Sequence, residues 1–586
     1  MVHMGIDNKK KSSIIQEKIQ EYLEIIKSHW NQYTDKQKNI ILGLGLSIFA
    51  ISFWLVYGLT TFQLTADMGI YLYGGQELLQ GNVPYVTVFD VKPPMTFFVS
   101  AIGLFFSNIL KLEPVVIGPR ILFLIFGSGT VFFTYLLTYH LFKDRYIAFL
   151  AAIILISFTG FGWGSLSGRP KIIMTFFSIA CLYYALFRKK WFIAGVFGSL
   201  SALTWQPGAI FPLIVIIYSF IDKKDREYNF IKAILGVALP LLIVALFFLI
   251  MGGFNEMLNQ SVLFVFSFKS SAHWGFFQSI GAAISNLLDV YGTEILFFIA
   301  GFFGFLLFTF KNRKNIINLK SPIFYIVFSF ILLFFYTCFD FQWWPDFIHT
   351  SPFIALFASF FIIKLSKKIG NLIKRKTRLK EKKIVTYFTI AIIILSSLYG
   401  ICPKFCEHEA VMTNIRTEII NKGDGEKITQ MESNGNILGV FSIMIEDIGF
   451  FRLMKMLFFT TKSFDVTLQE QTEFAKHIEE NSNPNQRLLF IATPHLLFLS
   501  NRKNFDEYVL YPADIIYMQI NDELSSYRKN VIEEKPLLII SNNWSRLEYT
   551  SSNTPNIPPE LELDEFIDEE YEILKQSKHF DIYIRK

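Results

Sequence analysis

The chain has 586 residues, of which 52% are hydrophobic and only 18% are charged. Soluble domains average about 25% charged residues, and the apolar residues here form long uncharged runs, which excludes a wholly soluble protein and indicates a polytopic membrane protein. The net charge of +6 does not indicate nucleic-acid binding, because Lys and Arg occur in short clusters between the apolar runs.

The chain begins with a polar segment, residues 1–38, in which residues 12–30 are predicted to form an amphipathic helix on the membrane surface. No cleavable signal peptide is expected. Apolar runs follow at about 40–60, 94–111, 115–142, 146–163, 171–187, 191–221, 229–251, 289–310, 322–339, 350–364 and 384–402. The run 191–221 carries Trp205-Gln206-Pro207-Gly208 in its middle, which predicts two short spans that meet at a break.

The basic clusters predict the orientation of the spans. The lysine-rich segment 1–38 is expected in the cytoplasm. If 94–111 spans fully, Lys143 and Arg145 fall outside. If it instead lies in the outer interface or re-enters, every later basic cluster falls inside, and this arrangement is preferred. This gives about eleven spans, a cytoplasmic N-terminus and an extracytoplasmic C-terminus. The segments then expected outside are 61–114, 164–170, 252–288 and 340–349.

The membrane part is predicted to span residues 39–402, and the composition of residues 403–586 is that of a soluble domain. The predicted elements are a helix at 467–482, strands at 487–493, 537–541 and 580–585, a short helix at 494–500 and an acidic helix at 564–576. This alternation indicates an extracytoplasmic α/β domain, and no glycine-rich phosphate loop opens a helix there. Cys402 and Cys406 could form a disulfide in an oxidising compartment or stay free.

The stretch 65–94 holds the first candidate residues. Asp67 follows the first span, and an ionisable group at membrane depth is a functional candidate. Its carboxylate could act as a general base. Tyr85 and Asp90 are candidate substrate-binding residues in the same stretch.

Cations on the predicted outer side could stabilise a departing phosphate; they are Lys92, Arg169 and Lys171. The alternatives are lipid-headgroup anchoring for Lys92 and a helix-end role for Arg169.

Later outer segments supply two further candidates. Trp344, beside Trp343, belongs either to an interfacial aromatic belt or to a sugar-stacking surface. His349 could hold a phosphate or be a buried residue at a helix start. His273 and Trp274 are also expected on the outer face.

Several short patterns occur in an order and at spacings that are typical of one protein family. They are Asp67 after the first span, Gly81 with Pro84 and Tyr85, Lys92-Pro93-Pro94, Arg120 at the start of the next span, and the segments 168–177, 347–356 and 484–512. Together they resemble the GT-C glycosyltransferases, in particular the group of protein mannosyltransferases (family 39) and aminoarabinose transferases. The resemblance rests on order and spacing and covers most of the chain.

The resemblance implies transfer of a sugar, mannose or a similar hexose or pentose, from a polyprenyl-phosphate donor to a glycan, lipid or protein acceptor on the outer face, with Asp67 as catalytic base and inversion at the sugar. Two positions depart from the family pattern. Met68 stands where an acid often follows the aspartate, and Lys171 stands where an acid often follows Arg-Pro. We therefore expect no cofactor, and the sequence leaves a divalent metal open.

Two other function classes remain at this point. A transporter or lipid-linked glycan flippase would use broken helices such as the one at Pro207, although no inverted repeat is visible. A membrane-anchored binding protein would act through residues 403–586, which contain no compact cluster of catalytic or metal-binding residue types.

Overall fold

The computed structural model describes residues 31–55, 58–222, 225–265, 281, 294–339, 344–374, 467–510, 512–542, 559–577 and 579–586. Several predictions lie outside these residues. They are the amphipathic helix at 12–30, the span at 384–402, the Cys402–Cys406 question, and the outer positions of His273, Trp274 and Trp343.

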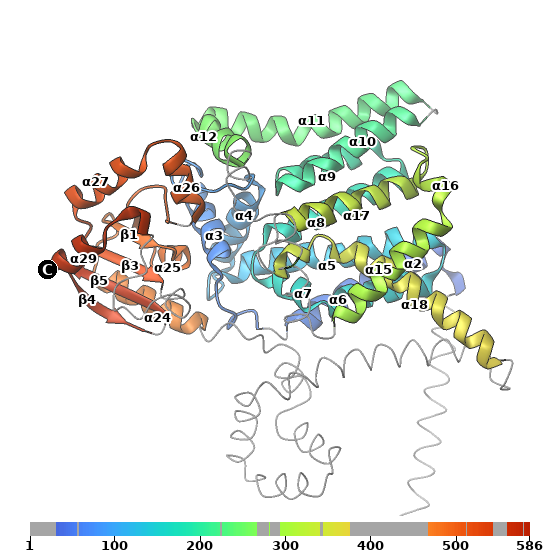
Figure 1. Ribbon diagram of the computed structural model, residues 1–586, viewed down its shortest axis with the longest axis horizontal. Helices are drawn as coiled ribbons and strands as arrows, with labels where there is room; N and C mark the ends of the chain where they lie inside the picture. The colour runs from blue at the N-terminus through green and yellow to red at the C-terminus, as the bar shows by residue number, and fades with distance from the viewer. Residues whose placement is uncertain are drawn as a thin grey trace, which may run out of the picture.

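The described membrane part is a bundle of helices (Figure 1). The helices are α2 (Asp35–Trp54), α3 (Ala66–Leu79), α4 (Met95–Leu110), α5 (Ile117–Phe142), α6 (Arg145–Ser157), α7 (Thr159–Leu166), α8 (Pro170–Tyr183) with η2 (Tyr184–Arg188), α9 (Trp191–Ala202), η3 (Gln206–Ala209), α10 (Ile210–Ile221), α11 (Arg226–Met251), α12 (Phe254–Leu258) with η4 (Asn259–Leu263), α15 (Glu294–Lys311), α16 (Arg313–Ile316), α17 (Pro322–Phe339), η5 (Trp344–Phe347) and α18 (Ser351–Lys374).

Within the described residues, four helical segments are long and apolar enough to cross a membrane: 35–54, 117–142, 170–188 and 226–251. Helices α6 and α7 form a fifth candidate that is bent by 63°. Five further apolar helices are shorter. The run 191–221 is indeed broken, since η3 separates α9 from α10. The protein is thus a polytopic helical protein, and the figure of about eleven spans stays a prediction.

Ion pairs bring three of the predicted inner segments together at one end of the bundle. Arg145 Nη2 lies 2.7 Å from Asp35 Oδ1, and Lys367 Nζ lies 3.3 Å from Asp144 Oδ2, so the starts of α2 and α6 meet the later part of α18. We call this the basic end. In Figure 1 it lies opposite the C-terminal domain.

Helix α4 starts and ends away from the basic end. Its first amide, Met95 N, donates to the Leu203 carbonyl at the end of α9. Its Gly103 packs against Pro119, at the start of α5, and α5 then runs to Phe142 beside the basic end. Whether 94–111 carries the chain across the membrane stays a prediction.

The C-terminal domain is built on a five-stranded sheet of order β2-β1-β3-β5-β4. The strands are β1 (Arg487–Ile491), β2 (Lys503–Asn504), β3 (Leu538–Asn542), β4 (Tyr571–Gln576) and β5 (Phe580–Arg585). β1 pairs in parallel with β2 and β3, whereas β5 is antiparallel to both β3 and β4. The helices are α24 (Leu468–Glu480), α25 (Pro494–Leu499), α26 (Pro512–Ile520), α27 (Leu524–Glu534), η6 (Pro559–Leu561) and α29 (Asp564–Glu570). The predicted α/β class is confirmed.

The prediction of one acidic helix over 564–576 is wrong in its second half. The helix α29 ends at Glu570, and Tyr571–Gln576 forms the edge strand β4. Tyr571 is buried and its hydroxyl donates to the Pro536 carbonyl at 2.6 Å. Pairing with β5 therefore overrides the helix propensity of Glu572, Leu574, Lys575 and Gln576, as tertiary context often does.

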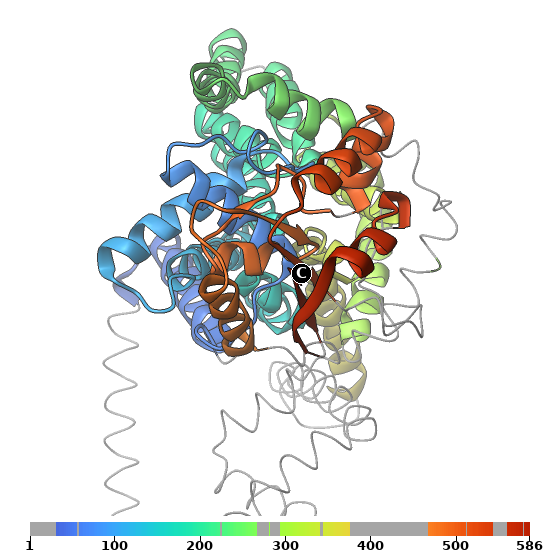
Figure 2. The ribbon, with the colours of Figure 1, turned by 90° about the vertical axis from the view of Figure 1, so that its left-hand side faces the viewer.

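The C-terminal domain packs directly on the first loop of the membrane part (Figures 1 and 2). One continuous buried cluster contains Met68 and Tyr71 of α3 together with Leu497 of α25 and Ile540 of β3. The helix that carries Asp67 thus lies between the bundle and the sheet domain.

Candidate active site

Asp67 lies in the first turn of α3. Thr65 caps this helix, because its hydroxyl accepts from Met68 N at 3.2 Å, and the same hydroxyl donates to the Ser167 carbonyl at 3.2 Å. A carboxylate is favoured in a first helical turn by the orphan N–H groups there. The Asp67 side chain is 32% exposed, so its carboxylate is partly accessible.

Arg120 fixes the segment that leads into α3. Its side chain is fully buried, and its guanidinium donates to the carbonyls of Leu59, at 2.7 Å, of Phe62, and of Gln63, at 3.0 Å. Buried carbonyls need such donors. Arg120, which the sequence placed only through the family resemblance, therefore holds the backbone that positions Asp67.

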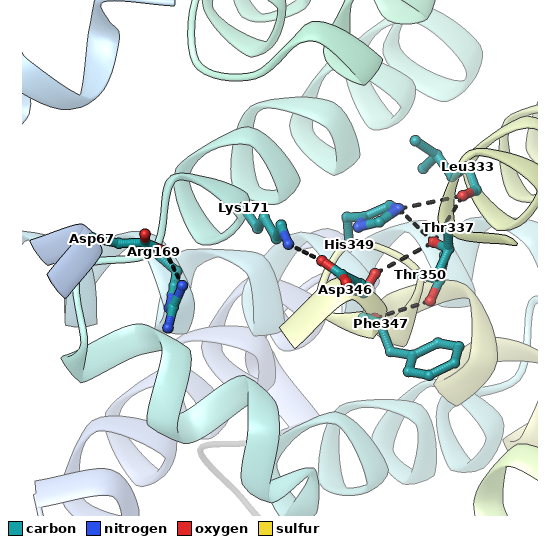
Figure 3. A network of polar contacts seen from close by, with 9 residues as sticks. All are labelled: Asp67, Arg169, Lys171, Leu333, Thr337, Asp346, Phe347, His349 and Thr350. Atoms are coloured by element: carbon teal, nitrogen blue, oxygen red, sulfur yellow. Dashed lines mark hydrogen bonds and ion pairs between the residues drawn. The ribbon is translucent and has the colours of Figure 1, made fainter. Parts of the chain in front are cut away.

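Arg169 reaches Asp67 from the turn between α7 and α8. Gly168 takes a left-handed φ of 70°, and an added Cβ there would lie 2.8 Å from Met68 Cγ. The turn brings Arg169 Nη1 into an ion pair with Asp67 Oδ2 (Figure 3). The guanidinium also lies over the Trp163 ring, 5.1 Å from its centroid. Base candidate and cation are thus adjacent.

Lys171 points to a different carboxylate. It follows Arg169 by two residues, and its Nζ pairs with Asp346 of η5 (Figure 3). The Nζ also lies over the Trp205 ring, 4.8 Å from its centroid. The side chains of Lys171 and Asp346 are only 14% and 9% exposed. Arg169 and Lys171 therefore pair with two different carboxylates, those of Asp67 and Asp346.

His349 lies beyond this pair and is almost fully buried. Its Nε2 lies 3.0 Å from the Thr337 hydroxyl and 3.3 Å from the Leu333 carbonyl, both in α17 (Figure 3). Its ring is also 5.1 Å from Trp205. These contacts link the residues just before α18 to α17. They fit the alternative in which His349 is a buried residue at a helix start. Trp344 begins η5.

Lys92 forms a third ion pair, with Asp90 Oδ1 at 3.5 Å. The Asp90 side chain is 4% exposed, and burial raises the pKa of its carboxyl, an effect that Lys92 partly offsets. Tyr85 is buried with φ 73°, and its hydroxyl donates to the Lys92 carbonyl at 2.6 Å. Tyr85 thus shapes the loop that presents Lys92.

Two glutamines that the sequence did not select hold this loop. Gln206, in the predicted break, donates to the carbonyls of Val91 at 2.6 Å and Ser261 at 3.0 Å. Gln260 donates to the Tyr85 carbonyl at 2.8 Å and accepts from Asp90 N at 3.3 Å. A glutamine beside a helix break is a usable signal for Gln206, whereas nothing local distinguishes Gln260.

The structure therefore brings Asp67 and Arg169 together, places Lys171 with Asp346, and holds Lys92 with Asp90. Among the described residues, no group of three or more His, Cys, Asp or Glu side chains is arranged to hold a metal ion. The geometry supplies a partly exposed carboxylate with a guanidinium beside it, which suits proton abstraction next to a developing negative charge.

Comparison with known proteins supports the fold. No family model matches the chain. Over 207 residues it is 22% identical to the dolichol phosphate-mannose mannosyltransferase of Haloferax volcanii, a match that covers 34% of this chain and 43% of that protein. The chain thus spans less than half the length of this curated relative.

Solved structures match over nearly the whole chain. ArnT from Cupriavidus metallidurans bound to undecaprenyl phosphate aligns with a TM-score of 0.54 at 12% identity, covering 93% of this chain and 97% of that one. Its apo state aligns with a TM-score of 0.50, also at 12% identity, over 94% and 98% of the two chains. ArnT is a GT-C aminoarabinose transferase. The predicted resemblance is therefore confirmed at the level of the fold, and this chain has the GT-C fold with a C-terminal sheet domain.

Proposed function

We propose that this protein is a membrane glycosyltransferase that moves a sugar from a polyprenyl-phosphate donor to an acceptor hydroxyl. The observation that carries the proposal is the partly exposed Asp67 paired with Arg169 within a GT-C fold. The lipid phosphates named for the two similar proteins, undecaprenyl phosphate and dolichol phosphate-mannose, support this donor class.

The site lies on the extracytoplasmic side in this proposal. The basic end, with Arg145 and Lys367, faces the cytoplasm under the positive-inside rule. Asp67 and the C-terminal domain are then at the outer face, and the N-terminus is inside. A lipid-linked donor suits this face because its tail stays in the bilayer while its phosphate meets the outer cations.

The proposed reaction is one displacement. The Asp67 carboxylate accepts the proton of the acceptor hydroxyl, whose oxygen forms a bond to the anomeric carbon. The bond from that carbon to the donor phosphate oxygen breaks, its electron pair stays on the polyprenyl phosphate, and the sugar configuration inverts. Asp67 later releases its proton to solvent.

The cations have separate tasks in this scheme. Arg169 contacts the base and stabilises the negative charge that develops on the departing phosphate. A planar guanidinium is suited to this because it can donate two parallel hydrogen bonds to phosphate oxygens. Lys92, with a side chain 25% exposed, offers a second contact for the phosphate. Lys171 stands two residues from Arg169 and would reach the phosphate only by exchanging Asp346 for it.

Mannose or a similar neutral hexose or pentose is the proposed sugar, and the acceptor is a glycan, lipid or protein. The test incubates the purified protein with radiolabelled polyprenyl-phosphate mannose and membrane extract. Transfer of label to an acceptor is expected, and Asp67→Asn should lower it by at least about a hundredfold, the usual scale of general-base loss.

Asp222→Asn is the matched control, because Asp222 also pairs with a cation, Lys189 at 2.7 Å, but at the ends of η2 and α10. It should retain activity. Substantial activity in Asp67→Asn would refute the role of this residue. Label that crosses vesicle membranes without covalent transfer would favour a flippase.

A further inference from the structure

The side chain of Gln471, in the C-terminal domain, bonds the segment just before Asp67. Gln471 of α24 donates from Nε2 to the Leu64 carbonyl at 2.9 Å and accepts at Oε1 from Leu64 N at 2.8 Å. Both groups of Leu64 are therefore held by one amide from a residue 407 positions away in sequence. Gln471 and Leu64 are each 2% exposed, so water does not replace these bonds.

The same domain also packs against α3 and bonds to it at other points. An added Cβ on Gly69 would lie 2.4 Å from His495 N, so the α3 and α25 backbones touch at this point. Gln76 donates to the Asn501 side chain, and Phe89 N donates to the Glu507 carbonyl at 2.8 Å. The domain thus contacts the first loop before, along and after α3.

Gly69 and Asp67 lie on nearly opposite sides of α3, because two residues turn an α-helix by about 200°. The side of Gly69 meets the C-terminal domain, and that of Asp67 meets Arg169 of the membrane bundle. Upstream, Arg120 of the bundle holds the Gln63 carbonyl and Gln471 of the domain holds Leu64. The start of α3 is therefore fixed from both sides.

We infer that the C-terminal domain positions Asp67 for proton abstraction and that Gln471 is the positioning residue. The domain stays docked during turnover and does not act as a lid. This inference rests on the proposed function for its kinetic consequence, while its structural part stands on the contacts themselves.

The first test replaces Gln471 by Met, which keeps the side-chain length and removes both bonds. A displacement of a reacting group by about 1 Å costs about a hundredfold in rate, so kcat should fall by about ten- to a hundredfold. KM for polyprenyl-phosphate mannose should stay within about twofold, because no donor contact is lost. Amide hydrogen exchange in residues 60–68 should become faster.

Gln469→Met is the matched control. Gln469 is exposed on the same helix, and its amide donates to Glu473 at 3.0 Å. This variant should match the unsubstituted protein in kcat, KM and exchange. Gln471→Met with unchanged kcat and exchange would overturn the inference, and so would a loss confined to a raised KM or caused by unfolding of the whole chain.

The second test separates positioning from a lid. Gln76→Cys and Asn501→Cys are joined by a short cleavable thiol crosslinker, in a background with Cys402 and Cys406 replaced by Ser. Crosslinked protein should keep its turnover. Turnover that stops on crosslinking and returns on cleavage would refute a permanently docked domain.

The two proposals fail in distinguishable ways. If the unsubstituted protein transfers no sugar, the proposed function fails, but exchange in residues 60–68 still reports whether Gln471 orders this segment. If it transfers sugar and Gln471→Met is fully active, only the positioning inference fails.

Discussion

Gly69→Ala is expected to loosen the C-terminal domain from α3. The added Cβ would lie 2.4 Å from His495 N, 2.7 Å from His495 Cα and 2.8 Å from the Pro494 carbonyl carbon. All three are backbone atoms, so no side-chain rotation relieves the overlap. Overpacking of this kind costs about 1–3 kcal/mol, and the rigid contact favours the upper value.

The helix propensity of Ala offsets part of that cost, by about 1 kcal/mol relative to Gly. The net cost is therefore about 2 kcal/mol. If the free energy of opening the C-terminal domain falls by this amount, its amides exchange about thirtyfold faster. The assay is hydrogen exchange of peptides that cover α25 and β1 in detergent-solubilised protein.

Gly45→Ala is the control, because Gly45 is also helical but has nothing within 4 Å of an added Cβ. It should leave α25 exchange unchanged. If α25 in Gly69→Ala exchanges no faster than in Gly45→Ala, the close backbone packing of α3 on α25 is refuted.

Lys171→Met should lower stability by about 3 kcal/mol, because it removes the cation beside Asp346, whose side chain is only 9% exposed. Adding Asp346→Asn should recover part of this loss in thermal unfolding, and equal melting of the single and double variants would show that the pair is not coupled. Burial raises the pKa of Asp506 in the C-terminal domain from 3.8 to about 8. The folded state therefore disfavours the ionised form, so the domain should lose stability as pH rises from about 4 to about 8. Asp506→Asn should flatten this pH dependence of domain unfolding, and an unaltered profile would contradict the raised pKa.

Local patterns in the sequence were enough to predict most elements. The break at Gln206-Pro207 separates α9 from α10, and the apolar runs 487–493 and 580–585 contain β1 and β5. Such features depend on residues close in sequence: proline removes a donor, and a short apolar run between polar turns fits a buried strand. Tyr571–Gln576 was misassigned because its pairing partner β5 decides its conformation.

The candidate site was predictable in its residues but not in their pairing. Asp67, Arg169, Lys171 and Lys92 were all selected from sequence, and all three cations were assigned to a phosphate. In the structure each of them pairs with a carboxylate, at Asp67, Asp346 and Asp90, and the phosphate role stays a proposal. Charge type is visible in a sequence, and Lys92 pairs with Asp90 inside one loop, whereas the partners of Arg169 and Lys171 depend on how distant helices pack.

The sequence by itself determined the membrane class and the basic clusters, of which those at Arg145 and Lys367 lie at one end, and it singled out Asp67 as the leading candidate carboxylate. Those properties follow from composition and local spacing. Only the tertiary structure decided that Arg120 and Gln471 hold the approach to Asp67 from opposite sides. These two contacts join residues 57 and 407 positions apart, and no local pattern encodes a hydrogen bond to a distant backbone group.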